Sequence, residues 1–355
     1  MAHTKQLSFI IPVYNAKSTL VETVQSILKQ DTGSLQIILV DDGSKDGSGA
    51  LCDRMRDAHP EIVYAIHQPN AGSLAARLAG AAVAEGEYIL YVDADDYMLD
   101  GAIEHIRQDI ASNADLYIYD YLMETVGGES VKTIKVMPPK KTTFFSSNQK
   151  IEVSKAFMNN WMNTVCATAI RRECMARISD YSFPEHLKNG EDRIQKMMLL
   201  ISANNIVYVP YSFYYYRWMP NSQGQGLRNG IFSQEIYENM VAIWEIERAN
   251  YKQLGFSRED IQRYDKRKLE RVCSLLEKHC ETAEAPKKLM KLIACDTLFG
   301  EISQADICKM ARFHVRFCAT CLHWHMYAVL QLYWKCIRLV RKRKYGKNGR
   351  KEPKE

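Results

Sequence analysis

The chain has 355 residues, of which 46% are apolar and 25% are charged. This ordinary globular composition excludes a wholly disordered chain, a collagen-like fibre and a small disulfide-stapled scaffold, and the length predicts about two domains. The formal charge of +5 gathers at the end of the chain, because eight Lys or Arg and two Glu give residues 341–355 a balance of +6. A basic tail on a nearly neutral body argues against a nucleic-acid partner.

The ten cysteines are scattered through the sequence, which indicates reduced thiols rather than a disulfide framework. The first residues lack the apolar stretch and small-residue cleavage site of a secretory signal. No run of 18 apolar residues is present, so a membrane-spanning helix is not expected. These observations predict a cytoplasmic protein.

Residues 1–125 alternate short apolar runs with helical patterns. Helices are expected near 20–28, where Thr19 and Glu22 have capping-box spacing, and over 73–84. Buried strands are expected at 7–13, 35–40, 62–66 and 88–92. The alternation predicts an α/β fold with a Rossmann-like, mostly parallel sheet and helices on both faces, whose ligands bind at the carboxyl ends of the strands.

The pattern changes twice further along the chain. Residues 126–225 are mixed, with an edge strand expected at 131–136, a helix at 190–203 and an aromatic strand region at 208–218. Residues 226–355 show charged helical patterns and no clear strand. We therefore divide the chain into 1–125, 126–225 and a C-terminal helical region, 226–355.

Carboxylates follow two of the expected strands. Asp93, Asp95 and Asp96 come directly after the fourth strand, and clustered carboxylates of this kind suit Mg²⁺ or Mn²⁺. Asp41 and Asp42 follow the second strand and could accept the ring N–H of a pyrimidine base. Taken alone, both clusters are equally compatible with polar turns.

Arg77 in the helix at 73–84 could be the fixed charge for a diphosphate, or an exposed helix arginine. Glu191 and Asp192 could perform acid–base chemistry, or could simply be acidic residues in the first turn of a helix, where the helix dipole favours them.

Five motifs follow one another in a characteristic order, and together they resemble the family 2 glycosyltransferases of the GT-A fold, of the inverting type that builds bacterial surface polysaccharides. The resemblance covers about residues 6–220. The motifs are Pro12-Val13-Tyr14-Asn15, Asp41-Asp42-Gly43-Ser44, Asn70-Ala71-Gly72-Ser73, Asp93-Ala94-Asp95-Asp96 and Asn189-Gly190-Glu191-Asp192.

The resemblance implies a site for a nucleoside diphosphate sugar, with a uridine-linked donor expected. Residues 1–125 would bind this donor, and 126–225 would bind the acceptor. The implied donor contacts are Pro12, Val13 and Tyr14 at the nucleobase; Asp41 or Asp42 as acceptors from the base; Asn70 and Gly72 at the backbone approach to the nucleotide; Arg77 at the phosphates; and Asp93 and Ala94 at the ribose.

The same resemblance implies a divalent metal, Mn²⁺ or Mg²⁺, and a general base. Asp95 would be the main metal ligand beside Asp93, with Asp96 as the competing choice. Asp192 would be the base that deprotonates the acceptor hydroxyl, and Arg217 would close over the diphosphate. Tyr214 stands where the processive synthases of the family carry Gln in their Q-x-x-R-W motif, which favours addition of a single sugar.

The expected function is therefore an inverting, metal-dependent hexosyltransferase acting on a glycan or lipid-linked saccharide. One alternative is a non-catalytic nucleotide-sugar-binding scaffold with the same fold. A nucleotidyltransferase is disfavoured, because Pro12-Val13-Tyr14-Asn15 is not a glycine-rich phosphate loop.

The last part of the chain has two further features. Cys318, Cys321, His323 and His325 have some character of a zinc site, although their apolar surroundings favour a packed helix. Residues 323–340 are rich in Trp, Tyr and Leu and run into Arg341-Lys342-Arg343-Lys344. Residues 323–355 are therefore expected either to contact the inner face of the membrane or to cover a protein core with a solvated tail.

Overall fold

The computed structural model describes residues 6–30, 33–125, 127–158, 164–178, 190–218, 232–282, 287–296, 299, 302–310 and 312–345. The chain divides into two compact units, Met1–Pro220 and Asn221–Glu355. Asn189 of the fifth motif and residues 346–355 of the basic tail lie outside the described residues.

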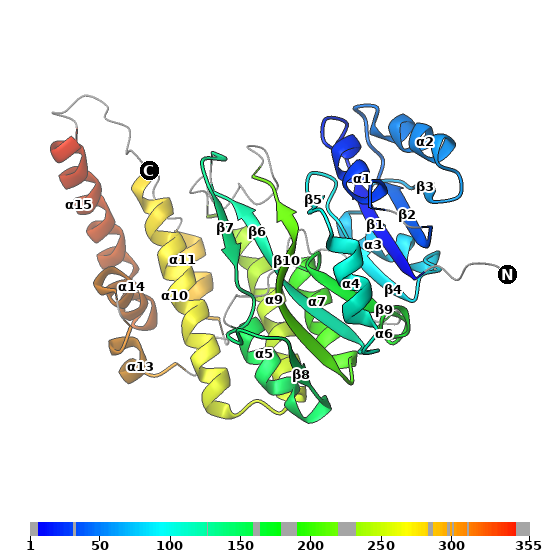
Figure 1. Ribbon diagram of the computed structural model, residues 1–355. Helices are drawn as coiled ribbons and strands as arrows, with labels where there is room; N and C mark the ends of the chain where they lie inside the picture. Colours follow the sequence, from blue (N-terminus) through cyan, green and yellow to red (C-terminus); the bar gives the residue numbers. More distant parts are fainter. Residues whose placement is uncertain are drawn as a thin grey trace. The chain divides into compact units, whose positions relative to one another are not determined.

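The first unit is built on one ten-stranded sheet (Figure 1). Its strands run in the spatial order β3-β2-β1-β4-β9-β6-β10-β5, while β7 pairs with β6 and β8 pairs with β10. The strands are β1 (Leu7–Val13), β2 (Leu35–Asp41), β3 (Val63–His67), β4 (Tyr88–Tyr91), β5 (Tyr97–Met98), β6 (Leu116–Glu124), β7 (Val131–Ile134), β8 (Thr143–Phe145), β9 (Thr168–Arg171) and β10 (Ile206–Tyr216).

The sheet is parallel in its N-terminal half and mixed beyond it. β3, β2, β1 and β4 are parallel neighbours, as their near-continuous apolar runs predict. β9 is then inserted antiparallel between β4 and β6, and β5, β7 and β8 each pair antiparallel. The expectation of a mostly parallel sheet therefore holds for β3, β2, β1 and β4 and for the parallel pair β6 and β10, while the other pairings of the sheet are antiparallel.

Helices connect and cover these strands. They are α1 (Leu20–Leu28), α2 (Ser48–Ala58), α3 (Ser73–Ala82), α4 (Ala102–Ile110), α5 (Lys150–Met158), α6 (Arg172–Ala176) and α7 (Glu191–Ser202), with a 3₁₀ turn at Ser147–Gln149. α3 packs on β1 and β2. Gly80 permits this close approach, since a Cβ there would lie 2.4 Å from Cγ2 of Ile10.

The capping box expected at the start of α1 is not formed. The Thr19 side chain makes no capping hydrogen bond, and its hydroxyl donates instead to the carbonyl of Ala16. The backbone of Thr19 is helical rather than extended, so its hydroxyl does not point at the first free amides of the helix.

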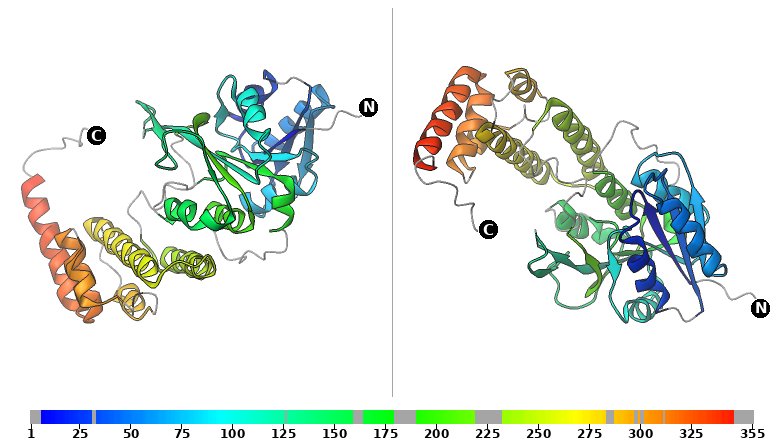
Figure 2. Two further views of the ribbon diagram at one scale, coloured as in Figure 1. Left: turned by 60° about the horizontal axis from the view of Figure 1, so that its bottom comes forward. Right: turned by 90° about the horizontal axis from the view of Figure 1, so that it is seen from above.

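The second unit consists of helices throughout its described part, as expected (Figures 1 and 2). Trp244, Leu276 and Trp334 are among its buried apolar side chains. Across the described residues of the whole chain, no helix combines the length and apolar character needed to cross a bilayer. The helices are α9 (Gln234–Gln253), α10 (Arg258–Thr282), α11 (Lys287–Ala294), α13 (Gln304–Cys308), α14 (Phe313–His323) and α15 (Tyr327–Tyr345).

The aromatic segment 323–340 is not one continuous helix. α14 ends at His323, and the chain turns through His325, whose φ is +54°, before α15 begins. Cys318 and Cys321 are buried in α14, whereas His323 and His325 are exposed. The four side chains therefore do not share one environment.

Candidate active site

The carboxyl ends of β1, β2 and β4 form the edge where the sequence motifs meet. Val13, the last residue of β1, is in register with Asp41, the last residue of β2, and β4 lies on the other side of β1. Val13 is buried, whereas Tyr14 beyond it is exposed. This arrangement leaves the Tyr14 ring accessible at the edge where ligands bind in such sheets.

Arg77 joins two carboxylates that are far apart in the sequence. Its guanidinium bonds Oδ1 of Asp192 through Nη1, and Nη2 lies 3.0 Å from Oδ1 of Asp93. Arg77 is only 2% exposed, so it is not a solvated helix arginine. A buried guanidinium is stable only when it is paired, and these two carboxylates provide the pairing.

The N-termini of α3 and α7 meet at a second contact. The Ser73 hydroxyl donates to Oε1 of Glu191 over 2.7 Å. α7 begins after Gly190, whose φ of +92° favours glycine, and this start places Asp192 in the first turn. The two contacts, Ser73 to Glu191 and Arg77 to Asp192, fix the acidic first turn of α7 beside the carboxyl end of β4.

The Asp192 carboxylate remains partly accessible, with 27% of its side chain exposed. Burial raises the pKa of Asp192 to about 6, because desolvation and the charges of Asp93 and Glu191 outweigh the attraction of Arg77. A carboxylate with a pKa near neutrality is suited to accept a proton.

Asp96 is held by the end of β10. Its Oδ2 accepts from the Tyr214 hydroxyl and its Oδ1 accepts from the Arg217 amide at 2.8 Å, and the residue is 1% exposed. The Tyr214 oxygen also accepts the Asp93 amide at 3.2 Å. The sequence predicted no role for Tyr214 in the site. Its position three residues before Arg217, where the processive synthases carry Gln, was the signal that could have indicated one.

Asp95 differs from Asp96 in its burial and in its hydrogen bonding. It is partly exposed, and within the described part of the chain its carboxylate makes no hydrogen bond to another residue. Burial and the nearby charge of Asp93 raise its pKa to about 6. No group of three or more His, Cys, Asp or Glu among the described residues forms a ready metal cage. Asp93 and Asp95 still fit Mg²⁺ or Mn²⁺, which proteins commonly bind through one or two carboxylates together with substrate phosphates.

Asp41 and Asp42 organise the loops of the same edge. Asp42 accepts from the amides of Ala71 and Gly72, each at 2.8 Å, and thereby shapes the turn at Gly72, whose φ is +90°. Asp41 accepts the Ser44 amide at 3.1 Å and lies 3.1 Å from Nδ1 of His67. Both carboxylates are buried. Their predicted contact with a base stays a prediction.

The remaining predicted residues surround this edge. Nη2 of Arg217 lies 2.8 Å from Oε2 of Glu22, and its guanidinium stands over the Tyr97 ring. Pro12 is half-buried and Ala94 is buried, whereas Asn70 and Gly72 are exposed. The structure therefore places every predicted residue at or near the ends of β1, β2, β4 and β10 or the starts of α3 and α7.

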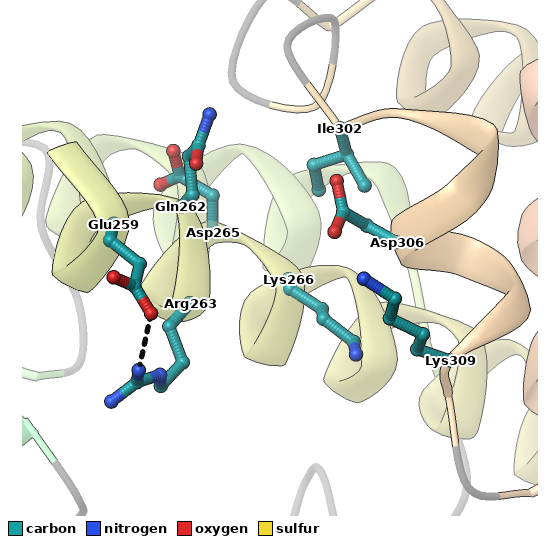
Figure 3. A pocket seen from close by; sticks show the side chains of 8 residues that line it. All are labelled: Glu259, Gln262, Arg263, Asp265, Lys266, Ile302, Asp306 and Lys309. Atoms are coloured by element: carbon teal, nitrogen blue, oxygen red, sulfur yellow. Dashed lines mark hydrogen bonds and ion pairs between the residues drawn. The ribbon is translucent and has the colours of Figure 1, made fainter.

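A hollow of about 260 Å³ lies in the helical unit, between α10 and the segment around α13 (Figure 3). Arg263, Lys266 and Lys309 line it together with the carboxylates of Glu259, Asp265 and Asp306. Nη2 of Arg263 is 3.0 Å from Oε1 of Glu259. The opposite charges balance, and none of the predicted site residues is here.

Comparison with known proteins bears on the family and the fold of the chain. The profile described as "Glycosyl transferase family 2" matches residues 8–178. This part of the chain, just under half of it, is similar to the family 2 glycosyltransferases. The matched segment includes the first four motifs and ends before Asp192.

Three relatives extend the comparison beyond this domain. The chain is 44% identical over 119 residues to Glycosyltransferase GlyG of Streptococcus pneumoniae, covering 32% of this chain and 38% of the relative. It is 25% identical over 311 residues to the uncharacterized glycosyltransferase EpsJ of Bacillus subtilis, covering 84% of this chain and 85% of the relative. It is 27% identical over 252 residues to the poly(ribitol-phosphate) β-N-acetylglucosaminyltransferase TarS of Staphylococcus aureus, covering 69% of this chain and 41% of the relative.

A solved structure of S. aureus TarS 1–349 with UDP-GlcNAc matches the fold. It has a TM-score of 0.62 and 17% identity, and the match covers 97% of this chain and 93% of that one. The fold class expected from the sequence, a GT-A domain followed by a helical region, is thus confirmed. The chain spans less than half the length of GlyG and of full-length TarS, and most of EpsJ.

Proposed function

We propose that this protein is an inverting glycosyltransferase that moves one sugar from a uridine diphosphate sugar to a glycan or lipid-linked saccharide. The observation that carries the proposal is the buried Arg77 guanidinium between Asp93 and Asp192. It couples the carboxylate expected at the donor to the carboxylate expected to be the base, although 99 residues separate them in the sequence.

In the proposed reaction Asp192 accepts the proton of an acceptor hydroxyl. The hydroxyl oxygen then forms a bond to the anomeric carbon from the face opposite the nucleotide, and the bond from that carbon to the diphosphate oxygen breaks. Uridine diphosphate leaves with the electron pair, and the proton stays on Asp192 until it is lost to water. The configuration at the anomeric carbon inverts because attack and departure occur on opposite faces.

The donor half of the site is assigned to the loops after β1, β2, β3 and β4. The exposed Tyr14 ring would stack on the base, and the exposed backbone at Gly72, held by Asp42, would approach the nucleotide. The Arg217 guanidinium, whose charge acts to lower the pKa of Asp95, would supply positive charge to the donor phosphates. A divalent ion held by Asp95 and Asp93 would neutralise charge on the leaving diphosphate.

Arg77 is proposed as a positioning residue rather than as a phosphate contact. Both of its terminal nitrogens already bond carboxylates, and its side chain is buried. It would hold Asp192 in place and favour its ionised form.

UDP-GlcNAc is the first donor to test, because the TarS structure with the same fold contains it. The names of two relatives, TarS and the minor teichoic acid biosynthesis protein GgaB of Bacillus subtilis, support a poly(ribitol-phosphate) or teichoic-acid acceptor. We propose that the enzyme works in the cytoplasm, at the inner face of the membrane, where a lipid-linked acceptor would be presented.

The test is a calorimetric titration of uridine diphosphate into the full chain with and without Mn²⁺, followed by a turnover assay with UDP-GlcNAc and other UDP-sugars. Metal-dependent binding that is lost in Asp95→Ala would support the donor site. Asp192→Asn should retain this binding and lose about 10²- to 10⁴-fold in turnover.

Two results would count against the proposal. Unchanged turnover in Asp192→Asn would remove Asp192 as the base. Metal-dependent binding of uridine diphosphate, with no transfer or hydrolysis of any UDP-sugar by the wild-type chain, would favour the non-catalytic scaffold instead.

A further inference from the structure

α15 has apolar side chains on two opposite faces. Leu330 and Trp334 are buried on the face that packs against neighbouring helices of the second unit. The other face is an exposed stripe, which we call the α15 outer face. It consists of Val329, Leu332, Cys336, Leu339 and Val340.

The α15 outer face is continuous. At 100° per residue, these five positions fall within about 100° of the helix circumference, the width of a stripe that normally faces a core. Leu332 is 62% exposed and Val340 is 63% exposed. Trp324 and Met326, in the turn before α15, are exposed as well. Isolated exposed apolar residues are ordinary, whereas a helical stripe of them marks an interaction surface.

The segment of the sequence that contains this face carries charge of one sign. Residues 307–351 contain twelve Lys or Arg and no Asp or Glu. The exposed Lys335 lies between Leu332 and Leu339 along the helix, and α15 continues through Arg341-Lys342-Arg343-Lys344. An apolar stripe on a basic helix has the composition of segments that lie in the headgroup region of an anionic membrane.

We infer that the α15 outer face docks on an anionic lipid surface, with Leu332, Leu339 and Val340 entering the headgroup boundary and the exposed Lys335 contacting lipid phosphates. The inference deepens the proposed function. It rests on that function in one point only, namely that the membrane would present a lipid-linked saccharide acceptor to the active site. A second copy of this chain is a poorer occupant, because the segment offers no carboxylate to pair with the Lys and Arg of its equivalent.

The aromatic side chains that the structure describes in α15 do not form its exposed apolar surface. Tyr333 and Trp334, which made the sequence look like an aromatic membrane helix, contact α14 instead: the Tyr333 ring lies 4.4 Å from Phe317, and the Trp334 ring lies 6.3 Å from His314. The exposed apolar residues of the α15 outer face are Cys336 and four aliphatic residues, Val329, Leu332, Leu339 and Val340. Substituting them therefore changes the surface without removing the packing of α15 on the unit.

The experiment is flotation of the full chain with vesicles of phosphatidylcholine alone or mixed with phosphatidylglycerol. The wild-type chain should float with the anionic vesicles and not with the neutral ones, and added salt should weaken this binding. Leu332→Ser/Leu339→Ser should reduce it by on the order of tenfold, and changing residues 341–344 to Gln should do the same.

Val83→Ser/Phe144→Ser is the matched control, since it removes two comparably exposed apolar side chains, 47% and 63% exposed, from the first unit. It should float as the wild type does. Equal flotation of Leu332→Ser/Leu339→Ser and the wild type would overturn the inference. So would a wild-type chain that ignores anionic vesicles and forms a dimer that the double substitution dissociates.

Uridine diphosphate binding separates this inference from the proposed function. All of these variants should bind uridine diphosphate with the affinity of the wild type, because none of the substitutions lies at the carboxyl ends of β1, β2 and β4. A chain that floats as described but binds no nucleotide would leave the docking surface standing and refute the glycosyltransferase proposal.

Discussion

At the scale of single residues, the protonation of Asp192 should govern the rate. Its raised pKa of about 6 is due to burial, opposed by Arg77. The base must be ionised, so turnover should be constant above this pH and fall about tenfold for each unit below it. The measurement is the turnover number at saturating donor over this range. Because the pKa of Asp95 is also raised to about 6, donor affinity must be measured at each pH as a control. A turnover number that does not change through pH 6 would contradict the assignment.

Lys196, one turn after Asp192 on α7, should make stability depend on pH. It is 1% exposed, it bonds the Thr168 hydroxyl, and burial lowers its pKa from 10.5 to about 7. The unfolded chain binds more protons between these values, so the cost of burying the charge is full below about pH 7 and is relieved as the pH rises toward 10.5.

Lys196→Met removes this cost. Relative to the wild type, the variant should be more stable at neutral pH, by on the order of 2–5 kcal/mol less the lost hydrogen bond. Urea unfolding at several pH values measures the difference, which should shrink as the pH rises. A difference that stays constant would show that Lys196 keeps its proton in the folded protein throughout this range, so that burial does not lower its pKa.

At the scale of elements, the contact of α3 with β1 depends on Gly80. In an ordinary helix, Gly→Ala stabilises by about 0.5–1 kcal/mol. Here the added Cβ would lie 2.4 Å from Cγ2 of Ile10, so Gly80→Ala should destabilise the protein by about 1–3 kcal/mol through overpacking. Urea unfolding measures this change, and Ala79→Gly reports the intrinsic helix preference alone. A more stable Gly80→Ala chain would refute the predicted clash.

The same helix shows how far the sequence could predict the site. The apolar run of β1 and the motifs around Asp42 and Asp95 carried local signals, and these predicted the strands and the edge where the polar residues meet. The contact of Arg77 with Asp192 had no local signal, because it joins two helices 115 residues apart. Likewise, β9 has only four residues, which is too short for a periodic pattern, so its antiparallel insertion was not predicted.

At the scale of the whole molecule, the chain has two separate apolar cores. In the first, Ile10 and Tyr91 are fully buried in the sheet; in the second, Leu276 and Trp334 are buried among helices. Sequence composition predicted the change from sheet to helices near residue 226. The orientation of α15 was harder to predict, because its two apolar faces have the same hydrophobic character and only packing distinguishes them.

Two cores predict two unfolding transitions, and a nucleotide should act on one of them. A ligand that binds only the native state stabilises it by about 2.7 kcal/mol at a hundredfold excess over its dissociation constant. Uridine diphosphate with Mn²⁺ should therefore raise the midpoint of the transition of Met1–Pro220 and leave that of Asn221–Glu355 unchanged. Scanning calorimetry of the full chain measures both, and Asp95→Ala should abolish the shift while keeping two transitions. A single transition that moves as a whole would show that the two units unfold as one, since the stabilisation of one core would then be shared with the other.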